Sequence, residues 1–402
     1  MNFPSAMGKQ LVAFPAGLPR HSTGLVNPKW EPVSGASGGL LHPVRTKIEQ
    51  DLLGARANNG RAYRRDDLPR LLTWMQGPPL TILLGIGISL AVIGLIICVA
   101  VAMVATSPRL APAEKDVFGF ASLRSTPDTE LPPLLRYPAG DGEQLAYRFY
   151  DSSADPILIF IHGSSYHGRS YHALASAVSA SGAAKVILPN LRGHYQSGRH
   201  RGDVEYIGQL EDDIADLIAE LRRQNYHGPI TLGGHSSGGG FVIRFAGGAH
   251  AQLVSRFLLS SPVIPTSSTL RDGSASGWAQ LHTRRLIGLV ILNALGIRGF
   301  NALPVIDFNK PVRLWDGTET LSYSYRLNTS YHPRNRYVSD LRKLAGKAIV
   351  LVGEHDEAVD AERLQKLFER ECPASLFKIL PDTNHFGIFT SAAVQKVLIS
   401  SL

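Results

Sequence analysis

Residues 229–239 read PITLGGHSSGG, an apolar run that leads directly into a glycine-rich turn around a serine. Gly234, Ser236 and Gly238 fit the pattern G-x-S-x-G. Between a strand and a helix, such a turn lifts the serine above the sheet edge, and its glycines let the strand and helix approach closely. The pentapeptide alone is a weak signal, but its place directly after a short apolar run makes it specific. We expect a strand, a sharp turn and a helix here, with Ser236 as candidate nucleophile.

A serine hydroxyl needs a neighbouring base, because it is a poor nucleophile at neutral pH. His385 lies in the loop PDTNHFG, directly after the last predicted strand, Leu376–Leu380. The imidazole in turn needs a carboxylate to fix its tautomer, and Asp356 follows the preceding strand in the sequence GEHDE. The chain order Ser, Asp, His predicts a triad of Ser236, Asp356 and His385. Three other carboxylates compete with Asp356 for the role of acid: Glu354, Glu357 and Asp360.

His355 is the rival to His385 as base, since it lies next to Asp356 in the chain. A histidine fixed in the same turn as the acid can hardly reach both that carboxylate and Ser236. His385 comes from the next loop, so it can direct one ring nitrogen toward the acid and the other toward the serine. We therefore expect His385 to be the base.

Short apolar runs alternate with helical patterns from about residue 144 onward. Apolar residues spaced by three and four between Ile207 and Leu221 predict a helix. Further strands are predicted at Gln144–Tyr150, Pro156–Ile161, Ala184–Leu188, Arg256–Leu259 and Lys347–Val352. This alternation predicts an α/β fold whose mostly parallel sheet is covered by helices on both faces.

The stretch from about 263 to 344 is far longer than an ordinary crossover connection, so we expect an inserted cap there. Within it, Gly277–Ile297 has a helical pattern and is apolar on nearly every face in its second half. Two interpretations stay open. The apolar surface either lines an acyl-binding pocket or packs onto the rest of the domain.

Residues 80–104 form an apolar run of 25 residues without a charge, LTILLGIGISLAVIGLIICVAVAMV. As a helix, a run of this length exceeds the roughly 30 Å hydrocarbon core of a bilayer, which favours a membrane span over a buried core helix. It is too long, and begins too far along the chain, for a cleaved signal peptide. The predicted order is a disordered segment 1–78, a transmembrane helix 79–105, a linker 106–140 and a folded domain 141–402. Arginines are more frequent just before the run than after it, which favours the folded domain on the non-cytoplasmic side.

The formal net charge is +8, but the folded domain has no Lys/Arg-rich run with interleaved aromatics, so we expect no nucleic-acid partner. Cys98 and Cys372 are the two cysteines, and only Cys372 falls in the folded domain. A disulfide within that domain is therefore excluded. The histidines show no grouping such as H-E-x-x-H, and we expect no metal and no cofactor. The sequence leaves the oligomeric state open.

Three further motifs show that residues 144–402 resemble the α/β-hydrolase superfamily, more closely its monoacylglycerol-lipase and lysophospholipase-like branch. IHGSS at 161–165 is similar to its HG-x oxyanion loop, LRGHYQSG at 191–198 to its D-x-R-G-x-G-x-S segment, and GEHD at 353–356 to its G-x-x-D acid turn. The resemblance implies that the backbone N–H groups of Ser164 and Ser237 form the oxyanion hole, where each donor contributes roughly 10²–10³ in rate. Asn190 stands where the family usually has Asp, and His194-Tyr195 replaces small residues, which bears on substrate preference.

These patterns predict a membrane-anchored serine hydrolase that cleaves carboxylic esters through an acyl-enzyme. The apolar cap segment and the anchor favour lipid esters such as monoacylglycerols or lysophospholipids. Thioester hydrolysis, acyl transfer and amide hydrolysis use the same residues and stay open. A non-enzymatic, membrane-tethered interaction protein of the same fold is a further alternative, since fold does not fix function. The completeness of the site separates this alternative from an enzyme.

Overall fold

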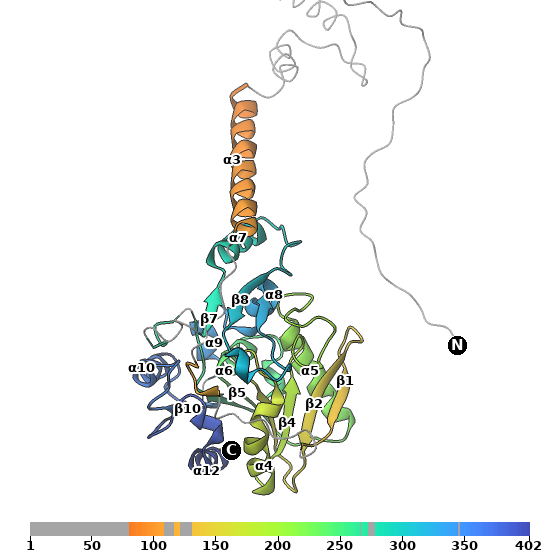
Figure 1. The fold of residues 1–402 in the computed structure, drawn as a ribbon, viewed down its shortest axis with the longest axis vertical. Helices are drawn as coiled ribbons and strands as arrows, with labels where there is room; N and C mark the ends of the chain where they lie inside the picture. The colour runs from red at the N-terminus through yellow and green to blue at the C-terminus, as the bar shows by residue number, and fades with distance from the viewer. Residues whose placement is uncertain (1–79, 108–115, 121–130, 266, 272–277, 345) are drawn as a thin grey trace, which may run out of the picture. The chain divides into compact units, whose positions relative to one another are not determined.

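The computed structural model describes residues 80–107, 116–120, 131–265, 267–271, 278–344 and 346–402. The segment 1–78, predicted to be disordered, lies outside these ranges. The chain divides into two compact units, Met1–Gly87 and Ile88–Leu402. Of the first unit, the structure describes only the helical residues at its end, so the account below concerns the second unit (Figure 1).

The main sheet of the second unit has eight strands in the order β1-β2-β4-β3-β5-β6-β10-β11. β2 is antiparallel to both of its neighbours, and all the other pairs are parallel. Five consecutive buried apolar residues in β3 show why this run becomes a central strand rather than an edge. The strands are β1 (Leu134–Pro138), β2 (Gln144–Tyr150), β3 (Ile157–Ile161), β4 (Lys185–Asn190), β5 (Ile230–His235), β6 (Arg256–Ser260), β10 (Ala348–Gly353) and β11 (Leu376–Leu380).

The helices around this sheet form two groups by their contacts. One group contains α4 (His172–Ala180), α11 (Gly387–Thr390) and α12 (Ala392–Ile399). The other contains α5 (Gln209–Arg223), α6 (Ser237–Ala246), α8 (Tyr325–Tyr331), α9 (Tyr337–Arg342) and α10 (Ala361–Glu371). Of these helices, α4, α5, α6, α10 and α11 contact the strands of the sheet directly. Short 3₁₀ turns are η4 (Gly168–Tyr171), η5 (Ala251–Leu253) and η6 (Val312–Leu314). The predicted mostly parallel α/β fold is confirmed.

The cap lies between β6 and β10, where the long insertion was predicted. It contains a three-stranded antiparallel sheet of β7 (Ala279–Leu281), β8 (Pro304–Phe308) and β9 (Ser322–Ser324), together with α7 (Thr283–Ala294). The helix predicted over 277–297 is therefore shorter than expected. Its first residues form β7 instead, because they pair with β8, a partner that the local pattern does not reveal.

The prediction that 106–140 is only a linker is wrong. Strand β1 pairs with β2 along its whole length, and Phe118 and Phe120 belong to the buried core. β1 escapes sequence analysis because it is an edge strand with mostly exposed side chains and ends in a proline, so it lacks the alternation of a half-buried strand. The sheet thus begins before residue 141.

Helix α3 (Leu80–Ala105) coincides with the predicted apolar run, and residues 81–105 are long and apolar enough to cross a membrane. Its side chains are exposed except near its C-terminal end, where Ala100 and Val104 pack with Leu289 and Leu292 of α7. Gly288 makes this approach possible, because a Cβ added there would lie 2.6 Å from the carbonyl oxygen of Ala100. The buried face of α7 therefore packs on α3, which favours the second of the two interpretations of the apolar cap segment.

Substitution of Leu90 and Leu95 tests α3 as an anchor, because both side chains are exposed and support no packing within the protein. We expect wild-type protein to stay in the membrane pellet after carbonate extraction. The variant L90D/L95D should move to the soluble fraction, since each acid costs roughly 2.5–3.5 kcal/mol at the centre of a membrane helix. L90I/L95I is the matched control and should stay in the pellet. Wild-type protein in the carbonate supernatant would contradict the anchor.

Candidate active site

Ser236 occupies the sharp turn between β5 and α6, as predicted. Its backbone has φ 57° and ψ −122°, a conformation that costs a non-glycine residue about 1–3 kcal/mol. The flanking glycines allow the turn to close: a Cβ on Gly234 would lie 2.4 Å from the carbonyl oxygen of Gly238, and a Cβ on Gly238 would lie 2.4 Å from that of His162. The glycine spacing is therefore a steric requirement of this strand–helix contact.

Asp356 and His385 form a buried pair. Nδ1 of His385 lies 2.9 Å and 3.0 Å from the two carboxylate oxygens of Asp356. Backbone N–H groups of Ala358 and Val359 also donate to Asp356 Oδ1, each at 2.8 Å. Burial acts to raise the pKa of Asp356, but attraction to His385 and these hydrogen bonds outweigh it and leave the pKa below its ordinary value. The carboxylate is thus ionised at neutral pH and able to orient the imidazole.

Ser236 and His385 line the same pocket. Among the described residues no hydrogen bond joins their side chains, a common state for catalytic groups before substrate binds. The walls are mostly aromatic and come from well-separated parts of the chain. The lining residues are Phe118, Phe120, Gly163, Ser164, Tyr166, Tyr171, His235, Ser236, Trp278, His385 and Phe386.

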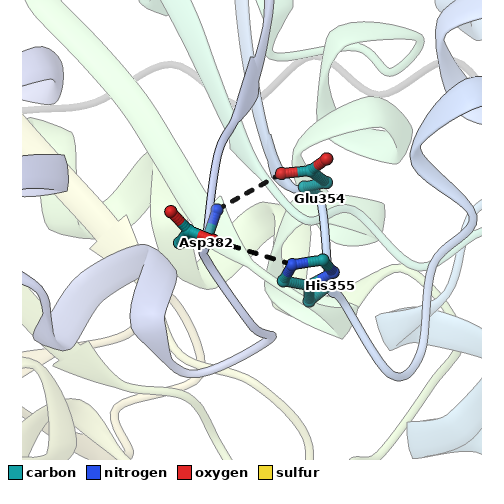
Figure 2. Close-up of side chains that lie close together, drawn as sticks. All are labelled: Glu354, His355 and Asp382. Atoms are coloured by element: carbon teal, nitrogen blue, oxygen red, sulfur yellow. Dashed lines mark hydrogen bonds and ion pairs between the residues drawn. The ribbon is translucent and has the colours of Figure 1, made fainter.

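His355, the rival candidate for the base, does not line the pocket of Ser236 and His385. Figure 2 shows His355 with Glu354 and Asp382 at the surface, where the His355 side chain is 64% exposed and its Nε2 is 3.9 Å from Asp382 Oδ1. One ligand atom from each of the three lies within 4.8 Å of the others. All three are exposed, and such groups are common without a metal, so the cluster by itself defines no site.

The competing carboxylates have other partners. Glu354 accepts a hydrogen bond from the backbone of Asp382, and Glu357 accepts one from the backbone N–H of His385. Asp360 caps the first turn of α10 by accepting from the backbone N–H of Arg363. Of the four candidate acids, Asp356 is the one that contacts the His385 ring.

Two tyrosines hold the predicted oxyanion loop. The backbone N–H of Gly163 donates to the Tyr171 hydroxyl at 2.9 Å, and that of Ser165 donates to the Tyr323 hydroxyl at 2.7 Å. Between them, the N–H of Ser164 donates to no acceptor in the described part of the chain, and the same holds for Ser237 at the first turn of α6. The Ser164 and Ser237 hydroxyls lie 2.6 Å apart, so the two residues are neighbours in space although they are far apart in the chain. Of the two predicted oxyanion residues, Ser164 lines the pocket, and Ser237 follows the pocket residue Ser236 in the chain.

Tyr171 also connects this loop to the candidate base. Its hydroxyl lies 3.0 Å from Nδ1 of His235 and donates to it, because the other ring nitrogen, Nε2, faces a carbonyl and must carry the proton of the neutral ring. His235 Nε2 then carries a proton and donates to the backbone carbonyl of His385 at 3.0 Å. Burial holds the pKa of His235 well below its ordinary value, so the ring is neutral, as this arrangement requires.

Cap residues complete the support. Nδ1 of His194 faces two backbone carbonyls and must donate, so Nε2 accepts from the hydroxyl of Tyr323 in β9, 2.7 Å away. Tyr323 in turn accepts from the N–H of Ser165, and the hydroxyl of Tyr331 donates to the carbonyl of His162. Burial lowers the pKa of His162 to about 4 and that of His194 well below its ordinary value, which keeps both rings neutral. His194, where the sequence departs from the family pattern, thus contacts the cap.

Asn190, the other departure, holds its own loop. Its side-chain oxygen accepts from the backbone N–H of Gly168 at 2.9 Å, and its Nδ2 donates to the carbonyl of Tyr195 at 2.8 Å. The supporting tyrosines and the aromatic walls could not be predicted from the sequence, because no local motif marks them. These aromatic residues lie in separate segments of the chain, and only the fold brings them together around the pocket.

The fold and this arrangement define an α/β-hydrolase. The chain belongs to the Hydrolase_4 family, described as serine aminopeptidase, S33, whose pattern matches residues 152–385. It is a serine hydrolase of that family and a distant relative of the monoacylglycerol lipases.

Two curated relatives illustrate this distance. The monoacylglycerol lipase of Mycolicibacterium smegmatis is 27% identical over 125 residues, which cover 31% of this chain and 44% of the relative. The chain thus spans less than half the length of that protein. The monoglyceride lipase of Saccharomyces cerevisiae is 22% identical over 278 residues, 63% of this chain and 86% of the relative. The crystal structure of a soluble variant of that lipase, in complex with a substrate analog, matches with a TM-score of 0.51 at 19% identity over 69% of this chain and 96% of that one. At this identity the structural match shows the shared fold.

Alanine substitution at the two histidines tests which of them is the base. We expect H385A to lower kcat for p-nitrophenyl acetate on the order of 10⁴-fold while KM changes little, since the serine loses its proton acceptor. H355A should retain most of the activity, because its ring is exposed and pairs with a surface carboxylate. Circular dichroism of both variants controls for folding. An inactive, folded H355A beside a fully active H385A would overturn the assignment.

Proposed function

We propose that the protein hydrolyses carboxylic esters with Ser236 as nucleophile, His385 as base and Asp356 as the acid that orients it. The observation that carries the proposal is the buried Asp356–His385 pair, whose histidine lines one pocket with Ser236. Two backbone N–H groups that donate to no acceptor among the described residues, at Ser164 and Ser237, would add the electrostatic part of the site. A protein that used this fold only for binding would not need this combination.

In the proposed reaction, Nε2 of His385 takes the proton of the Ser236 hydroxyl as its oxygen attacks the ester carbonyl. The oxyanion of the tetrahedral intermediate accepts hydrogen bonds from the N–H groups of Ser164 and Ser237. His385 then gives the proton to the departing alcohol, leaving an acyl-enzyme. Water attacks that ester with His385 again as base, and the acid is released. Asp356 stays ionised throughout and stabilises the imidazolium.

Lipid esters, such as monoacylglycerols or lysophospholipids, are the proposed substrates. The pocket walls favour this class, because Tyr166, Trp278 and Phe386 offer an acyl chain an aromatic surface. The distant relatives named as monoacylglycerol and monoglyceride lipases support the same class. Ester cleavage at a membrane would also suit a domain that follows a membrane helix.

We further propose that α3 anchors the enzyme as a single-pass membrane protein with the hydrolase domain on the non-cytoplasmic side. The helix has no charged residue over 25 apolar positions, and four arginines, Arg61, Arg64, Arg65 and Arg70, precede it closely. Basic residues accumulate on the cytoplasmic side of membrane helices, which supports this orientation.

A fluorophosphonate probe tests the chemistry without a choice of substrate. We expect the probe to label the wild-type chain in membranes, with the phosphonyl group found on Ser236 by mass spectrometry. S236A should give no label, and S400A, a surface control, should label as wild type does. Detergent-solubilised enzyme should release fatty acid from monoacylglycerol. Absence of labelling in folded wild-type protein would refute the serine-hydrolase mechanism, whereas labelling without lipid hydrolysis would refute only the substrate class.

A further inference from the structure

Residues 116–120, Asp-Val-Phe-Gly-Phe, insert two aromatic rings into the catalytic pocket. We call them the DVFGF segment. Phe118 is 5% exposed and Phe120 3% exposed, and both line the pocket that contains Ser236. The backbone N–H of Phe120 donates to Asp116 Oδ1 at 2.8 Å, and Gly119 has φ +69°, a conformation that favours glycine. The segment is thus a tight turn that buries both of its phenylalanines.

The rings contact the groups that would carry out the reaction and the walls around them. Phe118 lies over the imidazole of His385, with 5.2 Å between ring centroids, and 5.6 Å from Trp278 of the cap. Phe120 stacks on Tyr166 of the oxyanion loop at 5.7 Å and lies 4.7 Å from Trp278. The two rings therefore fill the space between the cap, the oxyanion loop and the base.

Little free space remains in the pocket beside the two rings. The free cavity volume is about 20 Å³, little more than the roughly 10–15 Å³ that a single water needs by this measure. An ester in contact with Ser236 and His385 needs room for its carbonyl, its acyl group and its leaving alcohol. A substrate in this pocket would therefore compete with the phenylalanine rings for the same walls.

We propose that this pocket is the acyl-binding subsite of the enzyme and that the DVFGF segment occupies it in place of the substrate's acyl chain. The inference rests on the proposed ester-hydrolase function. A phenyl ring and an acyl chain gain stability in the same way, by removing apolar surface from water against aromatic walls. Because the segment belongs to the same chain, its effective concentration at the pocket is high, and it competes with every substrate molecule.

Competition of this kind predicts a measurable effect. If only a fraction of molecules has an open pocket, the apparent affinity for substrate equals the affinity of the open form multiplied by that fraction. Removing the rings should raise kcat/KM. The effect should be largest for esters whose acyl chains are long enough to need the space of both phenylalanines.

The double variant F118A/F120A in the full-length, detergent-solubilised protein is the main test. We expect kcat/KM for p-nitrophenyl decanoate and the rate of labelling by a decyl fluorophosphonate to rise about tenfold or more. F300A, an exposed phenylalanine of the cap outside the pocket lining, is the matched control and should leave both rates unchanged. Rates in F118A/F120A equal to or below those of wild type, with the protein folded, would show that the two rings are a fixed wall of the pocket.

A second measurement needs no substitution and holds even if the double variant fails to fold. When Ser236 displaces fluoride from a decyl fluorophosphonate, the new Oγ–P bond leaves the alkyl chain inside the pocket. We expect chymotrypsin cleavage after Phe118 and Phe120 to increase at least several-fold in this adduct relative to unmodified enzyme, with cleavage after Phe300 as internal reference. Unchanged protection in the adduct would overturn the proposal. A folded protein that forms no adduct would instead refute the proposed function on which it rests.

Discussion

The close approach of β5 and α6 at Ser236 is the constraint on which the site depends. A strained backbone at Ser236 is tolerated because the strand and helix on either side are packed so tightly that even a methyl group at Gly234 or Gly238 would overlap a backbone oxygen. The same packing brings the first turn of α6 beside the loop after β3, so the N–H groups of Ser164 and Ser237 come from neighbouring residues. The proposed nucleophile and the proposed oxyanion donors thus depend on one steric arrangement.

Around this turn, buried neutral histidines and tyrosines form a hydrogen-bonded support. Each tyrosine hydroxyl at Tyr171 and Tyr323 accepts from the oxyanion loop and donates to a histidine, so every proton has a defined position. One branch reaches the backbone of His385, and the other reaches the cap. Burial keeps the rings uncharged, so in each ring one nitrogen donates to a backbone carbonyl and the other accepts from a tyrosine hydroxyl. The cap therefore contributes to the shape of the oxyanion loop as well as covering the site.

The cap and the chain before the sheet are more closely joined than a domain-and-linker description implies. α7 buries its apolar face against the end of α3, and Trp278 of the cap contacts both rings of the DVFGF segment. Both contacts involve residues that precede the first strand of the sheet. A domain cut from the chain at residue 141 would lose β1, the two phenylalanines and the cover of α7, and would expose apolar surface at each place.

The sequence alone determined the strand–turn–helix at Ser236, the strands of the main sheet other than β1, the apolar run of α3 and the α/β-hydrolase class. These features could be predicted because each depends on residues close together in the chain: glycine spacing, runs of apolar residues, and a histidine loop after the last strand. Only the tertiary structure decided which carboxylate contacts His385, since four acids lie within seven positions and the direction of each side chain depends on the fold. The same holds for Tyr323 and His194, which are 129 residues apart, and for Phe118 and Phe120, whose place in the pocket no local pattern marks. Local patterns fix backbone conformation, whereas contacts between distant side chains depend on how the whole sheet and its cap close around them.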